Sequence, residues 1–217
     1  MRSVGILSLL VGAAIVLGGA RTQDGQALFT DQAAVTDNTF ITASCFPGDT
    51  GFLDPSAEAA DSGGDGDGFE VTPTNAFADG GTDPNYKAEN IDGDGDRHRY
   101  YNYGISIKSA CTIPGIEVRV DWWLANLGGT NTLSVEVSWD GGTSWTAAKT
   151  DTEDGATEHS VVLGGPADTW GHAWTVAELS NANFRVRLTT SCTGPPTPCN
   201  NEDYFLDWVP VKVSYGP

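Results

Sequence analysis

Basic residues are scarce in this chain of 217 residues, in which 11 Lys and Arg are outnumbered by 29 Asp and Glu. The formal net charge at pH 7 is therefore −18. A surface of this sign repels phosphate groups, which excludes nucleic acid as a partner and disfavours docking on anionic lipid. The acidic balance is typical of a solvated surface that keeps a protein soluble, and it also suits the binding of cations.

Catalytic motifs are also missing from the sequence. The three histidines, His98, His159 and His172, have none of the spacings that zinc proteases require, such as H-E-x-x-H. Neither the G-x-S-x-G sequence of hydrolases nor a phosphate-binding P-loop occurs. Carboxylates are so numerous that a glycosidase pair cannot be recognised among them. We therefore expect a protein that is not an enzyme.

Helical periodicity is absent over any useful length, apart from a turn predicted at Thr175–Ser180. Apolar and polar residues instead alternate with the period of β-strands, and Gly, Pro, Asn and Asp mark the turns between them. The predicted strands cover residues 101–107, 116–124, 133–139, 159–163, 184–188 and 205–215. Strands of this length without repeats predict an all-β fold: a single two-sheet antiparallel sandwich, jelly-roll-like, after an N-terminal signal peptide.

A hairpin is predicted where the strand 133–139 meets Asp140-Gly141-Gly142, because Gly accepts a positive φ and Asp bonds to nearby amides. The spacing Ser138-x-Asp140-x-Gly142-x-x-Trp145 resembles the Asp-box, a hairpin motif of secreted β-proteins. In that family the motif is structural and lies away from the catalytic site. A β-propeller would carry several copies at a fixed period, so the single copy here argues against one.

One apolar run stands at the start of the chain. Arg2 precedes Val4–Gly19, a run of apolar and small residues that only Ser8 interrupts. This is the pattern of an export signal, and the run is short for a membrane span, which needs about 20 apolar residues. We expect residues 1–27 to be a cleaved signal peptide, 28–68 an N-terminal segment with an acidic loop, and 69–217 the β-sandwich domain. The mature protein is then secreted or bound to the cell surface, with no membrane segment.

The leader resembles those of SipW-dependent proteins of the TasA and camelysin type. The matching stretches are Gly18-Gly19-Ala20, Ala27-Leu28-Phe29-Thr30-Asp31 and Asn38-Thr39-Phe40. The resemblance implies a cell-surface or matrix protein, and some members of that family form fibres from copies of themselves. From Cys45 onward the sequence departs from that family.

Residues 49–96 are strongly acidic, with thirteen Asp and Glu against a single basic residue, Lys87. Asp alternates with Gly in the stretches 61–68 and 92–96, a pattern that lets carboxylates converge on a hard cation such as Ca2+. An EF-hand is excluded because Tyr103 stands where its last Glu ligand belongs. The alternatives are another type of calcium loop and a solvated acidic linker. The candidate ligands here are Asp92, Asp94 and Asp96.

Asp207 breaks the alternation of the last strand, because it falls on the apolar face. A bare buried carboxylate is costly, so we consider a bulge before Pro210, a salt bridge to an Arg, or a bound metal. The strand pattern resembles the jelly-roll modules of carbohydrate-active proteins, which often hold a structural calcium between an early acidic residue and an Asp of the final strand. That resemblance implies a pair formed by Glu70 and Asp207.

Four cysteines, an even number, fit two disulfides in an oxidising compartment. Cys192 and Cys199 flank a rigid Pro-rich loop, which favours a local disulfide between them. Cys45 and Cys111 then remain, and their pairing would tie the N-terminal segment to the sandwich.

Trp is frequent, with seven residues. Trp123 lies on the polar face of its predicted strand, and Trp170 and Trp174 lie in a Gly-rich loop. Such rings either form platforms that stack on sugars or anchor loops and the core. We expect a non-catalytic secreted protein of the cell surface or extracellular matrix, with a structural or adhesive role. Such a protein could also form fibres. The alternative is a calcium-stabilised carbohydrate-binding module, with glycans as partners.

Overall fold

The computed structural model describes residues 22–23, 26–27, 45–81, 85–125, 128–153, 155–194 and 202–217. The chain divides into two units, Met1–Thr42 and Ala43–Pro217. In the first unit, β1 (Thr22–Gln23) and β2 (Gln26–Ala27) pair antiparallel. The rest of the predicted signal peptide and the other residues of the leader resemblance lie outside the described residues. No helix in the described part of the chain is long and apolar enough to cross a membrane.

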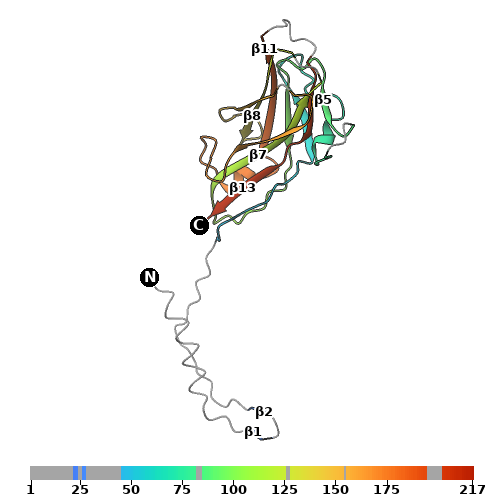
Figure 1. The fold of residues 1–217 in the computed structure, drawn as a ribbon. Coiled ribbons are helices and arrows are strands. Elements are labelled where there is room, and N and C mark those ends of the chain that lie inside the picture. The colour runs from blue at the N-terminus through green and yellow to red at the C-terminus, as the bar shows by residue number, and fades with distance from the viewer. Residues whose placement is uncertain are drawn as a thin grey trace. The chain divides into compact units, whose positions relative to one another are not determined.

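The second unit is an antiparallel sandwich of two sheets (Figure 1), as the sequence predicts. The six-stranded sheet contains β3 (Gly48–Asp49), β13 (Val211–Gly216), β7 (Thr112–Leu124), β12 (Tyr204–Trp208) and β5 (Ala88–Asn90), with β10 (His159–Gly164) along the other edge of β7. The five-stranded sheet contains β4 (Ala57–Asp61), β6 (Arg97–Tyr101), β11 (Arg185–Thr193), β8 (Thr130–Ser138) and β9 (Lys149–Glu153). Two short 3-10 helices, η1 (Pro73–Ala76) and η2 (Val176–Leu179), complete the regular structure of this part.

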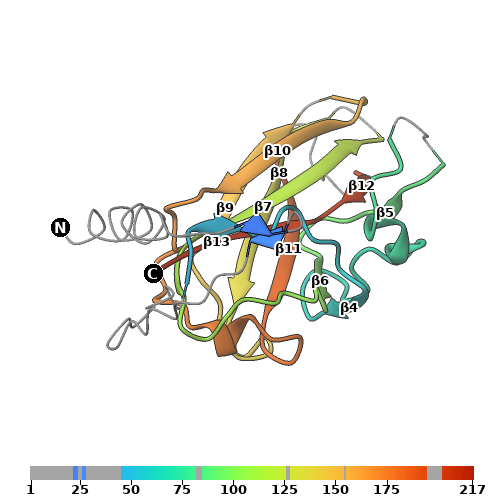
Figure 2. The same cartoon turned by 90° about the horizontal axis from the view of Figure 1, so that it is seen from below.

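Strand β7 is a central strand of the six-stranded sheet. It pairs with β10 along one edge and with β13 and β12 along the other. In Figure 2, β10, β7 and β12 lie above β6 and β4 of the other sheet. Alternate residues of β7 are buried between the sheets, as predicted, because the apolar side chains of a strand share one face. They pack against the buried residues of β8 and β11: Ile116, Val118, Val120, Trp122 and Leu124 face Leu133, Val135, Val137, Val186 and Leu188.

The predicted hairpin is present after β8. The strand ends at Ser138 and pairs with β9. Within the turn, Asp140 Oδ1 accepts the amides of Thr143 and Ser144 at 3.1 and 2.7 Å, and Ser138 Oγ accepts the amide of Gly142 at 2.9 Å. The turn is therefore closed by its own side chains.

One predicted strand is misplaced. The alternating residues 101–107 do not form a strand, because β6 ends at Tyr101. Asn102 and Gly104 adopt φ of 62° and 65°, and these left-handed residues break the extended backbone. Ile105 and Ile107 still pack against the core, but from a loop.

The predicted last strand is interrupted by a bulge, one of the three explanations considered for Asp207. The pairing register of β12 with β7 shifts between Leu206 and Trp208. Leu206 and Val209 therefore both point into the core, while Asp207 turns to the outer face of the sheet. There Asp207 is covered by the loop that contains Gly80 and has no exposed surface.

The sandwich begins before residue 69, the boundary expected from the sequence. Unit two starts at Ala43, and β3 and β4 pair with β13 and β6. Strand β4 reads Ala-Glu-Ala-Ala-Asp, with no β-branched or aromatic residue, so its sequence carries no strand signal.

The Cys45–Cys111 disulfide is present, with 5.2 Å between the Cα atoms, as predicted. It joins the start of the sandwich to the beginning of β7. Cys192 is disulfide-bonded as well, but Cys199, its predicted partner, lies outside the described residues. The local pairing therefore stays a prediction.

Candidate functional site

The two Gly/Asp stretches meet at one end of the five-stranded sheet. Strand β4 pairs with β6 in a register that sets Asp61 opposite Arg97. In an antiparallel pair, the residues that follow one strand lie beside those that precede the other. Residues 62–68 therefore lie against residues 92–96.

Three carboxylates converge at this meeting point. Asp65, Asp67 and Asp96 each contribute a side-chain oxygen, and these atoms lie within 4.8 Å of one another. We call these residues the loop cluster. Asp65 and Asp67 are exposed, whereas Asp96 is only 2% exposed. The sequence pattern identified Asp96 as a ligand but not Asp65 and Asp67, although their Asp-Gly alternation was visible.

A buried histidine holds the loop in place. His98 Nδ1 accepts the Phe69 amide at 3.1 Å, so the proton is on Nε2, which lies 2.8 Å from Glu58 Oε2. Burial lowers the pKa of His98 to about 4, and the ring is neutral at physiological pH. Gly68 adopts φ 65°, and a Cβ there would lie 2.7 Å from the same Nδ1 atom. The close approach of the loop to β6 therefore requires glycine.

Asp96 is only partly satisfied. Its Oδ1 accepts the Asp65 amide at 2.9 Å, but its buried Oδ2 has no hydrogen-bond partner. Burial is the main cause that raises the pKa of Asp96 to about 6, and the charges of Asp65 and Asp67 add to it. A buried carboxylate oxygen without a partner is costly, which makes this position a candidate for a bound ligand.

The structure places the other predicted ligands of this region elsewhere. Asp94 Oδ1 accepts the Cys192 amide at 2.9 Å, so Asp94 caps β11. The Asp92 amide donates to Asp203 Oδ1 at 3.1 Å in a turn with φ 53°. Neither residue belongs to the loop cluster with Asp96, which corrects the predicted ligand set. The spacing of Asp92, Asp94 and Asp96 predicts that one loop supplies all the ligands. In the structure, Asp96 instead lies with Asp65 and Asp67 of the stretch 61–68.

A second group of carboxylates lies on the outer face of the six-stranded sheet. Asp79, Asp121 and Asp207 also place oxygens within 4.8 Å of one another, and we call them the sheet cluster. The Gly80 amide donates to both Asp207 oxygens, at 3.1 and 3.0 Å. Burial raises the pKa of Asp207 to about 7, and the nearby Glu158 charge adds to the effect.

The positively charged side chain of Arg119 lies at the sheet cluster. Arg119 binds Asp121 through two hydrogen bonds of 2.8 and 2.6 Å and lies 3.9 Å from Asp79. Asp121 and Asp207 have no exposed surface, so neither can touch a substrate. The group is therefore a hydrogen-bonded network in which Arg119 pairs with Asp121, and its two buried carboxylates are closed to a substrate.

The predicted pair of Glu70 and Asp207 is not brought together. Glu70 Oε1 accepts the Ile91 amide at 2.9 Å. Burial is the main cause that raises the pKa of Glu70, and the nearby charges of Asp67 and Asp65 add to it. Asp207 belongs to the sheet cluster. Glu70 therefore lies near the loop cluster and Asp207 in the sheet cluster.

Aromatic rings border the sheet cluster on the surface. Tyr86 is 39% exposed and packs against Gly80, where an added Cβ would lie 2.1 Å from Tyr86 Cδ1. The half-buried Trp208 ring lies under the Arg119 guanidinium, with 4.6 Å between the guanidinium carbon and the ring centroid. Ser160 Oγ accepts a hydrogen bond from Arg119 at 3.1 Å. We call Tyr86, Trp208, Arg119, Asp79 and Ser160 the aromatic–arginine surface.

The three tryptophans considered as sugar platforms are buried. Trp123, Trp170 and Trp174 are 7%, 4% and 7% exposed. Trp170 Nε1 donates to Ile116 O at 2.9 Å, and Trp174 Nε1 donates to Thr169 O at 2.8 Å. Trp123 does face outward from its strand, but it packs on the Phe205 ring, with 5.5 Å between the ring centroids. All three act as anchors, the second alternative of the sequence analysis.

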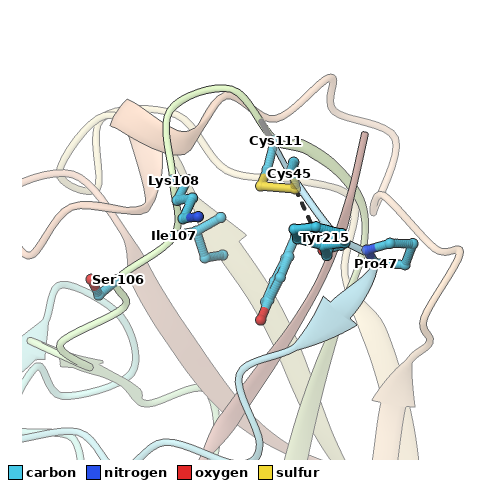
Figure 3. A pocket seen from close by; sticks show the side chains of 8 residues that line it. Cys45, Pro47, Ser106, Ile107, Lys108, Cys111 and Tyr215 are labelled. Carbon is cyan, nitrogen blue, oxygen red and sulfur yellow. Dashed lines mark hydrogen bonds between the residues drawn. A yellow bond between two sulfur atoms is a disulfide. The ribbon is translucent and has the colours of Figure 1, made fainter. Parts of the chain in front are cut away.

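A pocket of about 310 Å³ lies beside the Cys45–Cys111 disulfide (Figure 3). Lys108 and Tyr215 contribute to its lining, and Lys108 is its charged residue. No carboxylate or histidine lines this pocket, all of whose lining residues are described. It therefore offers neither an acid–base pair nor ligands for a cation.

The fold and the site together define an all-β, disulfide-linked sandwich with two carboxylate clusters, of which only the sheet cluster is paired with an arginine. No protein-family model and no curated protein matches the chain. A similar solved structure is the CBM32 of AlyQ in complex with 4,5-unsaturated mannuronic acid, at 16% identity and a TM-score of 0.39, covering 74% of this chain and 96% of that one.

Two further solved structures contain modules of this kind. The truncated AlyQ with CBM32 and alginate lyase domains has 15% identity and a TM-score of 0.38, with 79% of this chain and 34% of that one covered. The CBM22-1–GH10 modules of Clostridium thermocellum xylanase 10B, complexed with xylohexaose, have 10% identity and a TM-score of 0.37, with 74% and 26% covered. These likenesses are distant.

Proposed function

We propose that the chain is a non-catalytic, calcium-stabilised carbohydrate-binding module of a secreted protein, and that the aromatic–arginine surface binds the glycan. The observation that carries the proposal is that an exposed Tyr86, packed against Gly80, and a half-buried Trp208, under Arg119, both border the sheet cluster. Carbohydrate binding thus replaces the matrix role as the leading function.

The chemistry of this surface suits a sugar. The apolar faces of sugar rings stack on aromatic side chains, and their hydroxyl groups bond to planar polar groups such as guanidinium and carboxylate. Arg119 and Asp79 supply both kinds of planar group, and their side chains are 28% and 44% exposed. Asp121 and Asp207 lie beneath and hold Arg119 and Gly80 in position.

The charge of the chain narrows the ligand class. With a net charge of −18, the protein repels polyanions. Arg119 does not offset this repulsion, because Asp121 already neutralises it. We therefore propose neutral polysaccharides as the ligands.

The proposal is tested by measuring the binding of the purified chain to a glycan array, with soluble xylan and alginate as the neutral and anionic probes. Tyr86→Ala and Trp208→Ala should each weaken binding to the neutral glycan roughly tenfold, because a stacking contact contributes about 1–1.5 kcal/mol. Alginate should bind weakly or not at all.

Trp145→Ala is the matched control. Trp145 is also half-buried and also lies under an arginine, with Arg187 4.1 Å from its ring, but it belongs to the turn after β8. It should leave binding unchanged. Unaltered binding by both Tyr86→Ala and Trp208→Ala would refute the proposed surface, and no binding to any glycan would refute the function.

The cell-surface or matrix role implied by the leader remains a second proposal. The Cys45–Cys111 disulfide favours an oxidising compartment and so supports export. Self-association into fibres would appear by electron microscopy of the secreted protein. A monomer at all concentrations would leave only the glycan-binding role.

A further inference from the structure

We propose that the loop cluster, Asp65, Asp67 and Asp96, is a Ca2+-binding site that joins the two Gly/Asp stretches. The inference rests on the calcium part of the proposed function and is independent of the glycan part. It replaces the ligand sets expected from the sequence, of which it keeps only Asp96.

The spacing of the three oxygens fits one ion. Ca2+ binds oxygen at about 2.3–2.6 Å, so two ligands of the same ion are at most about 5 Å apart. The three carboxylate oxygens lie within 4.8 Å of one another. Ca2+ takes six to eight oxygens, and the exposure of Asp65 and Asp67 leaves room for water to complete the shell.

The buried oxygen of Asp96 points to a ligand independently of this spacing. Asp96 is almost fully buried, since only 2% of it is exposed, and its Oδ2 has no hydrogen-bond partner. A divalent cation would satisfy that atom and offset the charge that burial leaves uncompensated.

The charges around the two clusters differ. In the sheet cluster Arg119 pairs with Asp121, so the cation is already provided by the protein. Among the ion pairs of the described residues, none joins a Lys or Arg to Asp65, Asp67 or Asp96. Arg97 is near, but its Nη1 donates to the Ser62 carbonyl at 3.3 Å. The loop cluster is therefore three acids without a basic partner.

The backbone around Asp96 is fixed before any ion binds. The Thr190 amide donates to Asp96 O at 3.1 Å, and the Gly95 amide donates to Thr190 O at 2.9 Å. On the other stretch, Gly64 has φ 55°, and a Cβ there would lie 1.7 Å from Asp96 Oδ1. The glycine thus permits the close approach that brings Asp65 and Asp67 to Asp96.

The test is calorimetric titration of CaCl2 into the full chain after treatment with a chelator, together with the melting temperature with and without Ca2+. Wild type should bind about one ion per chain and melt at a higher temperature with Ca2+. Asp96→Asn and Asp67→Asn should each weaken binding roughly tenfold or more and reduce the calcium-dependent rise in melting temperature.

Asp79→Asn, which removes a carboxylate of the sheet cluster, is the matched control and should bind Ca2+ as wild type does. Folding of the variants is checked without calcium. The amide side chain of the Asp96→Asn variant would keep the Oδ1 acceptor for the Asp65 amide and remove a repelling charge. Without calcium, this variant should therefore be at least as stable as the calcium-free wild type.

Three results would overturn the site: no calcium binding by wild type, unchanged binding by both loop-cluster variants, or loss of binding in Asp79→Asn alone. The glycan assay on Asp96→Asn separates the two proposals. If the variant loses Ca2+ but still binds the neutral glycan, the calcium site stands and is structural. If wild type binds glycan but no Ca2+, only the calcium inference fails.

Discussion

At the scale of single residues, the buried carboxylates Asp207 and Asp96 show two ways of tolerating a charge in the protein. Asp207 receives the Gly80 amide on both oxygens and lies beside a network that contains Arg119. Asp96 has one satisfied oxygen and one without a partner. The protein supplies hydrogen bonds to both oxygens of Asp207, whereas in our proposal an ion binds the free oxygen of Asp96.

Asp207→Asn should change how stability depends on pH. Because the pKa of Asp207 is raised from 3.8 to about 7, the folded protein binds a proton in this range that the unfolded chain has released. Stability therefore falls as the pH rises from about 4 to 7, and this contribution should vanish in the variant. Urea unfolding at several pH values, with a chelator present, measures it.

Glu158→Gln serves as the comparison for that experiment. The Glu158 charge raises the pKa of Asp207, so removing it should move the fall in stability to lower pH without abolishing it. If wild type and Asp207→Asn lose stability in parallel across this range, Asp207 does not titrate as described.

At the scale of elements, the sequence predicts a strand well only where burial alternates. Strand β7 is recognised because Ile116, Val118 and Val120 are buried and the residues between them are not. The same rule fails for Trp123, because the outer face of the sheet is covered as well, and burial no longer follows the alternation. The sequence does not predict strand β4, because its pairing with β6, and not its own composition, makes it a strand.

The candidate site depends on contacts that no local pattern contains. The loop cluster exists because the register of β4 and β6 brings Asp65 to Asp96, residues that are far apart in the sequence. The aromatic–arginine surface depends on the bulge that turns Asp207 and Trp208. Sequence could indicate an acidic, Gly-rich region and an anomalous Asp207, but not their partners.

We expect the Trp170 side chain to anchor its loop to the sandwich. Trp170 is 4% exposed and donates to the Ile116 carbonyl of β7, so Trp170→Ala should lower the free energy of unfolding by about 3–5 kcal/mol. Trp170→Phe should cost less, about 1 kcal/mol, because the Ile116 carbonyl loses one of its donors but keeps the Gly165 amide at 3.1 Å. Denaturant unfolding measures both.

Val162→Ala is the control on the neighbouring strand β10, where Val162 is 46% exposed. It should change stability by no more than about 0.5 kcal/mol. A small effect of Trp170→Ala, similar to that of Val162→Ala, would contradict the role of Trp170 as an anchor and reopen its assignment as a sugar platform.

At the scale of the whole sandwich, the Cys45–Cys111 disulfide closes a long part of the chain. Its cysteines are 66 residues apart, and the segment between them carries β3 to β6 and the whole loop cluster. Closing a loop of this length removes conformational entropy from the unfolded chain, which corresponds to about 4 kcal/mol. Strands as short as β3 and β4 depend on such a link, because each adds little buried surface of its own.

The double variant Cys45→Ala/Cys111→Ala should therefore lose about 2–4 kcal/mol of unfolding free energy, measured in denaturant without reductant. The matched comparison is Cys192→Ala/Cys199→Ala, which opens the short Pro-rich loop that the sequence predicts to be bridged. Because loop-closure entropy grows with loop length, the long link should matter more than the short one. A larger loss in the Cys192/Cys199 variant would show that strain or packing at the short loop, and not the closure of residues 45–111, dominates the stability of the sandwich.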